Sequence, residues 1–223
     1  MIIFRYPFLL LSGILMLAGC SDNKSYETAI CALADVSGTY AQEKGSMVQI
    51  IKTGLIPKMV PGDGFYFIAI DSNSYAEDNL ITKVTLDYRP SEVVKQKMAF
   101  SKTLDQFAAD DLKSDYTDIS GAMMLCADYL KASKAGYRLM FVFSDMKEEL
   151  PSGLTRVFEA DEFSGIDIAA MNVIKLDKDS ANPQIYRDRL KDWNKKLNEA
   201  GAKSWTNLMD AAKIPEFIES VKS

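Results

Sequence analysis

Histidine is missing from this sequence of 223 residues. Without an imidazole, the chain can build neither a Ser-His-Asp nor a Cys-His nucleophilic system, and no zinc site that needs histidine. Any chemistry or binding must therefore use carboxylates, hydroxyls, lysine, tyrosine or a metal ion bound through oxygen.

Basic residues are in the minority, with 26 Lys and Arg against 31 Asp and Glu, which gives a formal net charge of −5. A nucleic-acid-binding chain is normally basic, so we expect no nucleic-acid partner. The acidic surface favours cations instead. With 48% hydrophobic and 26% charged residues, a disordered chain is excluded, and the length fits one domain.

The N-terminus has the layout of a secretory signal. Arg5 is its one charged residue, residues 6–17 are mostly apolar, and this run is too short for a comfortable membrane span. It ends in Leu17-Ala18-Gly19-Cys20, which resembles the lipobox of bacterial lipoproteins. The resemblance implies that residues 1–19 are removed and that Cys20 is acylated. An uncleaved anchor, or an ordinary signal with an incidental cysteine, remains the alternative.

Acylation with more than one chain, such as palmitate, would anchor the protein stably in a lipid bilayer. Ser21, rather than aspartate, follows Cys20. By resemblance to Gram-negative lipoproteins, this implies a cell-envelope protein in the outer membrane that faces the periplasm. We therefore predict a lipidated cysteine and polar tether at residues 20–26, and a single domain at residues 27–223.

Hydrophobic patterns alternate between strands and helices along this domain. We predict buried or edge strands at residues 27–34, 65–70, 81–88, 138–143, 167–176 and 202–205. We predict helices at residues 40–59, 93–112, 117–133, 182–200 and 206–221, the last interrupted near Pro215. This order indicates an α/β fold, Rossmann-like and doubly wound, with a mainly parallel sheet covered on both faces. The alternating run at 81–88 is typical of an edge strand with one wet face.

Three polar segments come at the ends of predicted strands or at the start of a helix. They are residues 35–39 (Asp-Val-Ser-Gly-Thr), residues 117–119 (Thr-Asp-Ile) and residues 144–145 (Ser-Asp). In a doubly wound sheet all three would lie at the carboxyl edge of the strands, where ligands bind. Carboxylate and hydroxyl oxygens are hard ligands, which suit Mg²⁺, or Mn²⁺ and Ca²⁺, rather than zinc.

This pattern resembles the metal-ion-dependent adhesion site (MIDAS) of von Willebrand factor A (vWA) domains. Asp35, Ser37 and Thr39 match the Asp-x-Ser-x-Ser motif, with Thr39 in place of the last serine, while Thr117 and Asp145 match the distant threonine and aspartate. The resemblance implies a six-stranded sheet with one antiparallel edge strand. It also implies a non-enzymatic domain that binds a protein, whose Asp or Glu completes the coordination of the metal.

Other interpretations of the same residues stay open. The 35–39 loop also resembles the Asp-x-Asp-Gly-Thr loop of haloacid-dehalogenase-like phosphatases, although Ser37 replaces the second aspartate, which is their acid/base. Asp35, Ser37 and Thr117 are also residue types that favour turns and helix caps, so a structural envelope lipoprotein with a degenerate site is a third alternative. We expect Asp118 to be solvated, with a position facing the site as the alternative.

Cys31 and Cys126 are two cysteines of the mature chain, in a compartment that allows disulfides if the chain is exported. Cys31 lies about 13 Å along a strand from the end of that strand. Cys126 lies about 13.5 Å along a helix from Thr117. Because both elements start at the same edge, the sulfurs can lie at one depth and form a disulfide. Two buried thiols are the alternative.

Overall fold

The computed structural model describes residues 26–38, 40–171 and 182–223. Its strands are β1 (Thr28–Asp35), β2 (Gly64–Ile70), β3 (Leu80–Thr85), β4 (Tyr137–Phe143), β5 (Asp167–Met171) and β6 (Ser204–Leu208). Its main helices are α1 (Lys44–Ile50), α2 (Pro90–Ala109), α3 (Ile119–Ala132), α5 (Pro183–Glu199) and α6 (Ile214–Lys222). Short helical turns are η1 (Tyr40–Glu43), η2 (Ile51–Leu55), η3 (Ile56–Lys58), η4 (Glu77–Asn79) and η5 (Ala211–Lys213).

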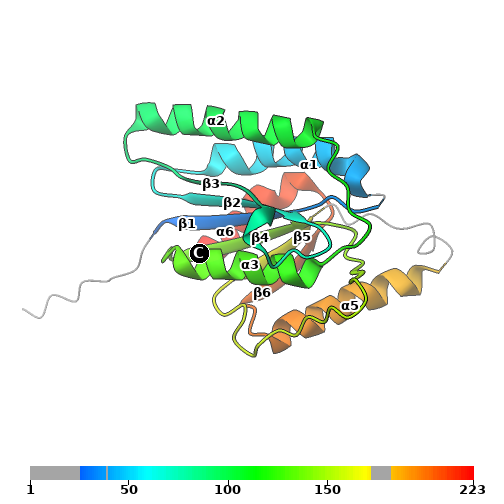
Figure 1. The fold of residues 1–223 in the computed structure, drawn as a ribbon. Helices are drawn as coiled ribbons and strands as arrows, with labels where there is room; N and C mark the ends of the chain where they lie inside the picture. Colours follow the sequence, from blue (N-terminus) through cyan, green and yellow to red (C-terminus); the bar gives the residue numbers. More distant parts are fainter. Residues whose placement is uncertain (1–25, 39, 172–181) are drawn as a thin grey trace, which may run out of the picture.

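The six strands form one sheet in the order β3-β2-β1-β4-β5-β6 (Figure 1). Five strands are parallel, and β3 pairs antiparallel with β2 at one edge. The predicted doubly wound, mostly parallel sheet with an antiparallel edge strand is therefore confirmed. All eight residues of β1 are buried, as expected for a central strand with a helix layer on each face.

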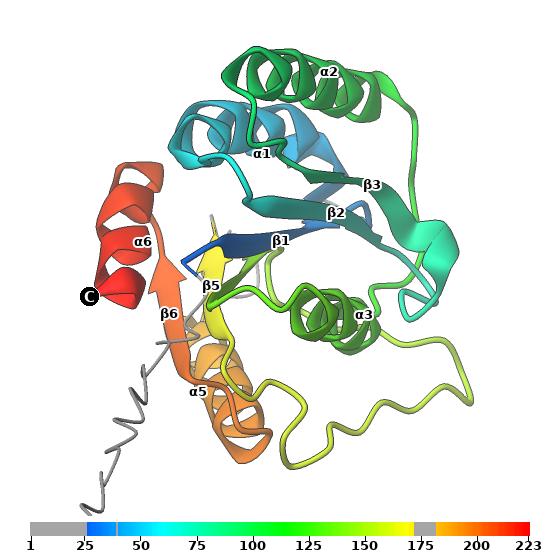
Figure 2. The same cartoon turned by 90° about the vertical axis from the view of Figure 1, so that its left-hand side faces the viewer.

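Helices cover both faces of the sheet: α1, α2 and α6 lie on one face, and α3 and α5 on the other (Figure 2). The period of two along β1 divides its side chains between two cores. Ile30, Ala32 and Ala34 belong to the core under α1, α2 and α6, whereas Ala29, Cys31 and Leu33 belong to the core under α3 and α5.

Strand register brings the predicted polar segments to one edge. Asp35 at the end of β1 is in register with Ile70 of β2, and Ala34 is in register with Phe143 of β4. Because parallel strands end together, the segments after β1, β2 and β4 emerge side by side at what we call the carboxyl edge. The opposite end of the sheet, where β1 begins, is called the amino edge below.

The C-terminal elements differ from the prediction. The strand expected at residues 202–205 is β6, and it pairs in parallel with β5 from Asp167↔Ser204 to Met171↔Leu208. The helix expected from residue 206 begins at Ile214, with Pro215 in its first turn. Proline is tolerated there because its missing N–H would have no partner in the helix. Pro215 therefore starts this helix and does not interrupt it. The predicted strand 167–176 is described only as far as Met171.

The structure joins Cys31 of β1 and Cys126 of α3 as a disulfide, with their Cα atoms 6.1 Å apart in space and the two residues 95 positions apart in the sequence. Both residues are fully buried. The bond ties the central strand to the helix whose first turn lies at the carboxyl edge. Within the described ranges, no helix is long and apolar enough to span a membrane.

Candidate metal centre

Asp35 closes β1 and orders the loop that follows it. One carboxylate oxygen, Oδ1, accepts hydrogen bonds from the backbone N–H of Ser37 at 2.8 Å and from the Ser37 hydroxyl at 2.5 Å. The other, Oδ2, accepts from the hydroxyl of Ser144 at 2.7 Å, directly after β4. Gly38 takes a positive φ of 44°, where a side chain would be strained, as the chain turns away. Asp35 thus holds two of the predicted segments together.

Thr117 comes to the same place from a third segment. Its hydroxyl donates to the Ser37 hydroxyl at 2.5 Å, across 80 positions of sequence. Its backbone is fixed by two hydrogen bonds with Glu149, from Thr117 N–H to Glu149 O at 2.8 Å and from Glu149 N–H to Thr117 O at 3.0 Å. Thr117, Ser37 and Asp35 therefore form one continuous chain of hydroxyl and carboxylate oxygens.

Asp145 follows Ser144 at this edge and is buried. One of its oxygens accepts a hydrogen bond from the backbone N–H of Lys147 at 2.7 Å, and its negative charge contributes to raising the pKa of Asp35. The structure thus brings together Asp35, Ser37, Thr117 and Asp145, four of the five predicted ligands. Thr39, the fifth, lies outside the described residues, as does Cys20.

Electrostatics at Asp35 favour a positive partner. Burial raises the pKa of its carboxyl from 3.8 to about 6, in spite of opposing hydrogen bonds from Ser37 and Ser144. The charged form is therefore poorly solvated where it stands. A cation at this point would stabilise the carboxylate, because an opposite charge close by offsets the loss of water.

The residue types decide which ion this place can hold. In the described part of the chain, no three side chains of Asp, Glu, Cys or His gather closely enough to hold a metal ion by themselves. Any ion here would need the hydroxyls of Ser37 and Thr117 in addition to the two aspartates. Such an all-oxygen set fits Mg²⁺ and related hard cations and does not suit zinc.

Asp118 is not solvated, and that expectation was wrong. Its side chain is fully buried and caps α3, accepting from the backbone N–H of Gly121 at 2.8 Å. It also accepts from the backbone N–H of Ser74 at 2.9 Å and forms an ion pair with Arg156, whose Nη2 lies 2.6 Å from Oδ2. The helix therefore begins at Ile119, after Thr117, and leaves the Thr117 hydroxyl free to turn toward Ser37.

The segment after β4 stabilises the start of α3 through hydrogen bonds. Glu148 accepts a hydrogen bond from the backbone N–H of Ser120 at 2.6 Å, and Arg156 binds both Asp118 and, at 2.9 Å, Asn73 Oδ1. Trp193 of α5 donates to Met146 O at 2.8 Å. No sequence pattern pointed to Glu148 or Arg156, because the segment between β4 and β5 has no periodicity that would show where its side chains point.

The sheet order, the antiparallel edge strand and the helices on both faces define a vWA-like fold. Among solved structures, BatB from Bacteroides thetaiotaomicron is similar, with a TM-score of 0.50, 13% identity and coverage of 87% of this chain and 98% of that one. Proximal thread matrix protein 1 from the mussel byssus has a TM-score of 0.50 and 11% identity, covering 89% of this chain and 48% of that protein.

The PilB minor pilin from Streptococcus sanguinis is similar over 90% of this chain and 61% of its own, with a TM-score of 0.50 and 10% identity. At such low identity these likenesses show the fold alone. No family model matches the sequence, and no curated protein does either.

Proposed function

We propose that this chain is a lipid-anchored envelope protein whose vWA-like domain binds a partner protein through a divalent cation. Asp35, Ser37, Thr39, Thr117 and Asp145 would hold the ion, with Mg²⁺ the expected metal and Mn²⁺ or Ca²⁺ the other candidates. An Asp or Glu of the partner would complete the coordination. The role is binding, without a chemical reaction.

One contact carries this proposal: the Ser37 hydroxyl oxygen lies 2.5 Å from both Asp35 Oδ1 and Thr117 Oγ1. Three hard ligands from two distant segments therefore converge already in the folded chain. A preorganised set of ligands binds an ion more tightly than a set that must first be assembled, because little conformational entropy remains to be lost.

The neutral ligands explain why the ion would need a partner. Hydroxyls do not cancel charge, and Asp35 and Asp145 are the two carboxylates of the set. An ion that touches the hydroxyls directly and the carboxylates through water keeps much of its positive charge. A carboxylate from outside the chain is the group that such an ion attracts most strongly.

The surroundings of the site suit a protein partner. Large apolar side chains on the loops of the carboxyl edge and in the first turn of α5 are 41% to 72% exposed, namely Tyr75, Leu112, Tyr116, Val157, Ile185 and Met209. Aromatic and long apolar side chains are typical of protein interfaces. We propose that they contact the partner around its metal-bound carboxylate.

The anchor rests on Leu17-Ala18-Gly19-Cys20 and on Ser21 after it. Acylation of Cys20 would attach the domain to the bilayer, and in a Gram-negative host this would be the outer membrane, on its periplasmic side. Mass spectrometry of the mature N-terminus tests this part separately from metal binding.

The central test is calorimetric titration of the protein with Mn²⁺ and Mg²⁺. We expect binding by the wild type and at least a tenfold loss of affinity in Ser37→Ala, because the central oxygen is removed. Ser133→Ala is the matched control, since Ser133 lies at the amino edge and donates to Leu130 O. Equal affinity in wild type and Ser37→Ala would refute the metal site. A pull-down from an envelope extract then identifies the partner. A partner is a protein that the wild type retains with Mg²⁺ and that is lost both with chelator and in the Ser37→Ala variant.

A further inference from the structure

The amino edge of the sheet, where the chain enters the domain, carries its own exposed apolar groups. Tyr26, two residues before β1, is 70% exposed; Val60, in the turn before β2, is 51% exposed; and Tyr88, after β3, is 71% exposed. All three lie at the end of the sheet opposite the candidate metal centre. They are therefore separate from the apolar side chains proposed above to contact a protein partner.

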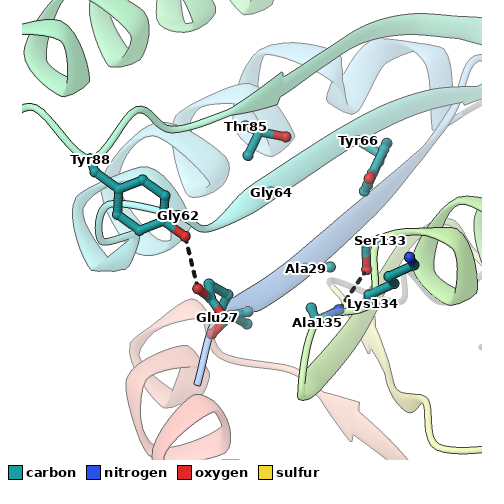
Figure 3. A pocket seen from close by; sticks show the side chains of 11 residues that line it. Glu27, Ala29, Gly62, Gly64, Tyr66, Thr85, Tyr88, Ser133, Lys134 and Ala135 are labelled. Atoms are coloured by element: carbon teal, nitrogen blue, oxygen red, sulfur yellow. Dashed lines mark hydrogen bonds between the residues drawn. The ribbon is translucent and has the colours of Figure 1, made fainter. Parts of the chain in front are cut away.

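A polar cavity of about 360 Å³ opens between these elements (Figure 3). On one side the Tyr88 hydroxyl donates to Glu27 Oε1 at 2.9 Å. Gly62 makes this pairing possible: its φ is +90°, and a Cβ there would lie 2.9 Å from Glu27 Cγ and 3.1 Å from the Tyr88 ring. This wall of the cavity therefore requires glycine at position 62. It presents the ring and hydroxyl of Tyr88 next to the carboxylate of Glu27.

Lys134 stands on the other side of the cavity, in the turn between α3 and β4 (Figure 3). Its φ is +57°, in the left-handed region that glycine adopts without cost and lysine does not. Lys134 directly follows the C-cap of α3, where a left-handed residue commonly ends a helix. The lysine is exposed, and this turn puts its ammonium group on the rim of the cavity.

We infer that the amino edge lies against the headgroup layer of a phospholipid membrane, with Tyr26, Val60 and Tyr88 in the interface and headgroups entering the cavity. The inference rests on the proposed acylation of Cys20. Tyrosine is enriched where a protein meets the membrane interface, because its ring is apolar and its hydroxyl is wet.

The length of the tether supports this orientation. Five residues lie between Cys20 and Tyr26, and the six steps from one to the other reach at most about 20 Å when fully extended. From Tyr26 along β1 to Asp35 the chain covers about 30 Å. The tether is thus shorter than the sheet, so the carboxyl edge cannot lie flat on the bilayer that holds Cys20. The candidate metal centre then points away from the membrane, toward its partner.

Charge favours the same orientation. Lys58 and Lys134 are exposed at the amino edge and would be attracted by anionic headgroups. At the carboxyl edge, exposed Asp115 would be repelled, whereas Asp111 and Glu149 form ion pairs with Lys113 and Lys147. Glu27 adds a negative group beside the cavity, which suits the ammonium of phosphoethanolamine while Lys134 suits its phosphate.

The test uses the full acylated chain reconstituted in phosphatidylethanolamine and phosphatidylglycerol vesicles. A fluorophore on Tyr88→Cys reports on the amino edge, and one on Tyr116→Cys is the matched control at the carboxyl edge; both tyrosines are exposed. With nitroxide-labelled headgroups in the vesicles, we expect at least threefold stronger quenching at position 88 than at position 116. Val60→Cys is a second amino-edge reporter in case the first variant does not fold.

A further variant distinguishes contact of the amino edge with the membrane from simple attachment through the acylated Cys20. Combining Tyr26→Ser and Lys134→Gln should reduce the quenching at position 88 at least twofold, while acylation is unchanged. Equal quenching at positions 88 and 116 in acylated protein would overturn this inference and leave the metal-dependent function intact. An N-terminus without acyl chains would refute the anchor and this inference together.

Discussion

The guanidinium of Arg156 lies against the carboxylate of Asp118, with Nη2 2.6 Å from Oδ2 and Nε 3.1 Å from both carboxylate oxygens. Asp118 is fully buried, and the Arg156 side chain is 12% exposed. Because Asp118 follows Thr117 directly and caps α3, this ion pair holds the backbone that presents the Thr117 hydroxyl. It links the long segment after β4 to the candidate metal centre.

Arg156→Met should therefore be strongly destabilising. It leaves the Asp118 carboxylate buried without its charged partner, which costs about 3–5 kcal/mol when a buried pair is broken from one side. Urea unfolding followed by circular dichroism measures the loss. Arg187→Met is the control, because Arg187 is exposed and bonds to Gln184, and about 0.5 kcal/mol or less is expected there. Similar losses in both variants would contradict a special role for Arg156.

Thr117→Val should weaken Mn²⁺ binding at least tenfold while leaving the fold intact. Valine has nearly the shape of threonine but lacks the hydroxyl, so it removes one predicted ligand. Thr117→Ser keeps the oxygen and should restore affinity to within about threefold of the wild type. Calorimetric titration of the three proteins provides the comparison. If Thr117→Val bound Mn²⁺ as tightly as Thr117→Ser, the hydroxyl would not be a ligand.

The metal-free protein should lose stability as pH rises from about 4 to 7. Burial raises the pKa of Asp35 from 3.8 to about 6, so between these values the folded chain keeps a proton that the unfolded chain has lost. By linkage, stability falls with rising pH over this window, by up to about 3 kcal/mol.

Unfolding free energies in chelator at pH 4.5 and pH 7, compared between the wild type and Asp35→Asn, isolate this group. The asparagine variant cannot titrate, so its pH dependence should be smaller by the contribution of Asp35. Added Mg²⁺ should recover stability of the wild type at pH 7 and not of the variant. An identical pH profile in both proteins would show that the carboxyl is not desolvated in the folded chain.

The disulfide between Cys31 and Cys126 spans 95 positions. The chain-entropy model gives a loop of this size about 4–5 kcal/mol of stabilisation, which is an upper estimate. Reductant should therefore lower the unfolding midpoint of the wild type markedly and leave Cys31→Ala/Cys126→Ala unaffected. Alkylation in denaturant without reductant shows directly whether the two cysteines are free thiols or a disulfide. If both thiols were labelled under those conditions, the bond would not form in the protein.

Local patterns predicted much of the fold. The apolar runs of β1, β2 and β4 and the alternation of β3 are local signals, and they placed the central strands and the edge strand correctly. The antiparallel direction of an edge strand came from the resemblance to vWA domains. The start of α3 was misplaced by two residues, because either Thr117 or Asp118 can cap a helix and the sequence does not say which one does. The start of α6 was misplaced because pairing with β5 keeps residues 206–208 in β6.

By itself, the sequence determined the residue types and their order: oxygen ligands without histidine, polar segments after strands, and a cysteine behind an apolar leader. Only the tertiary structure decided that the Thr117 hydroxyl meets Ser37 and that Arg156 neutralises Asp118. These contacts join segments 80 and 38 positions apart. Their geometry depends on strand register and on helix packing against the sheet, which no local pattern specifies.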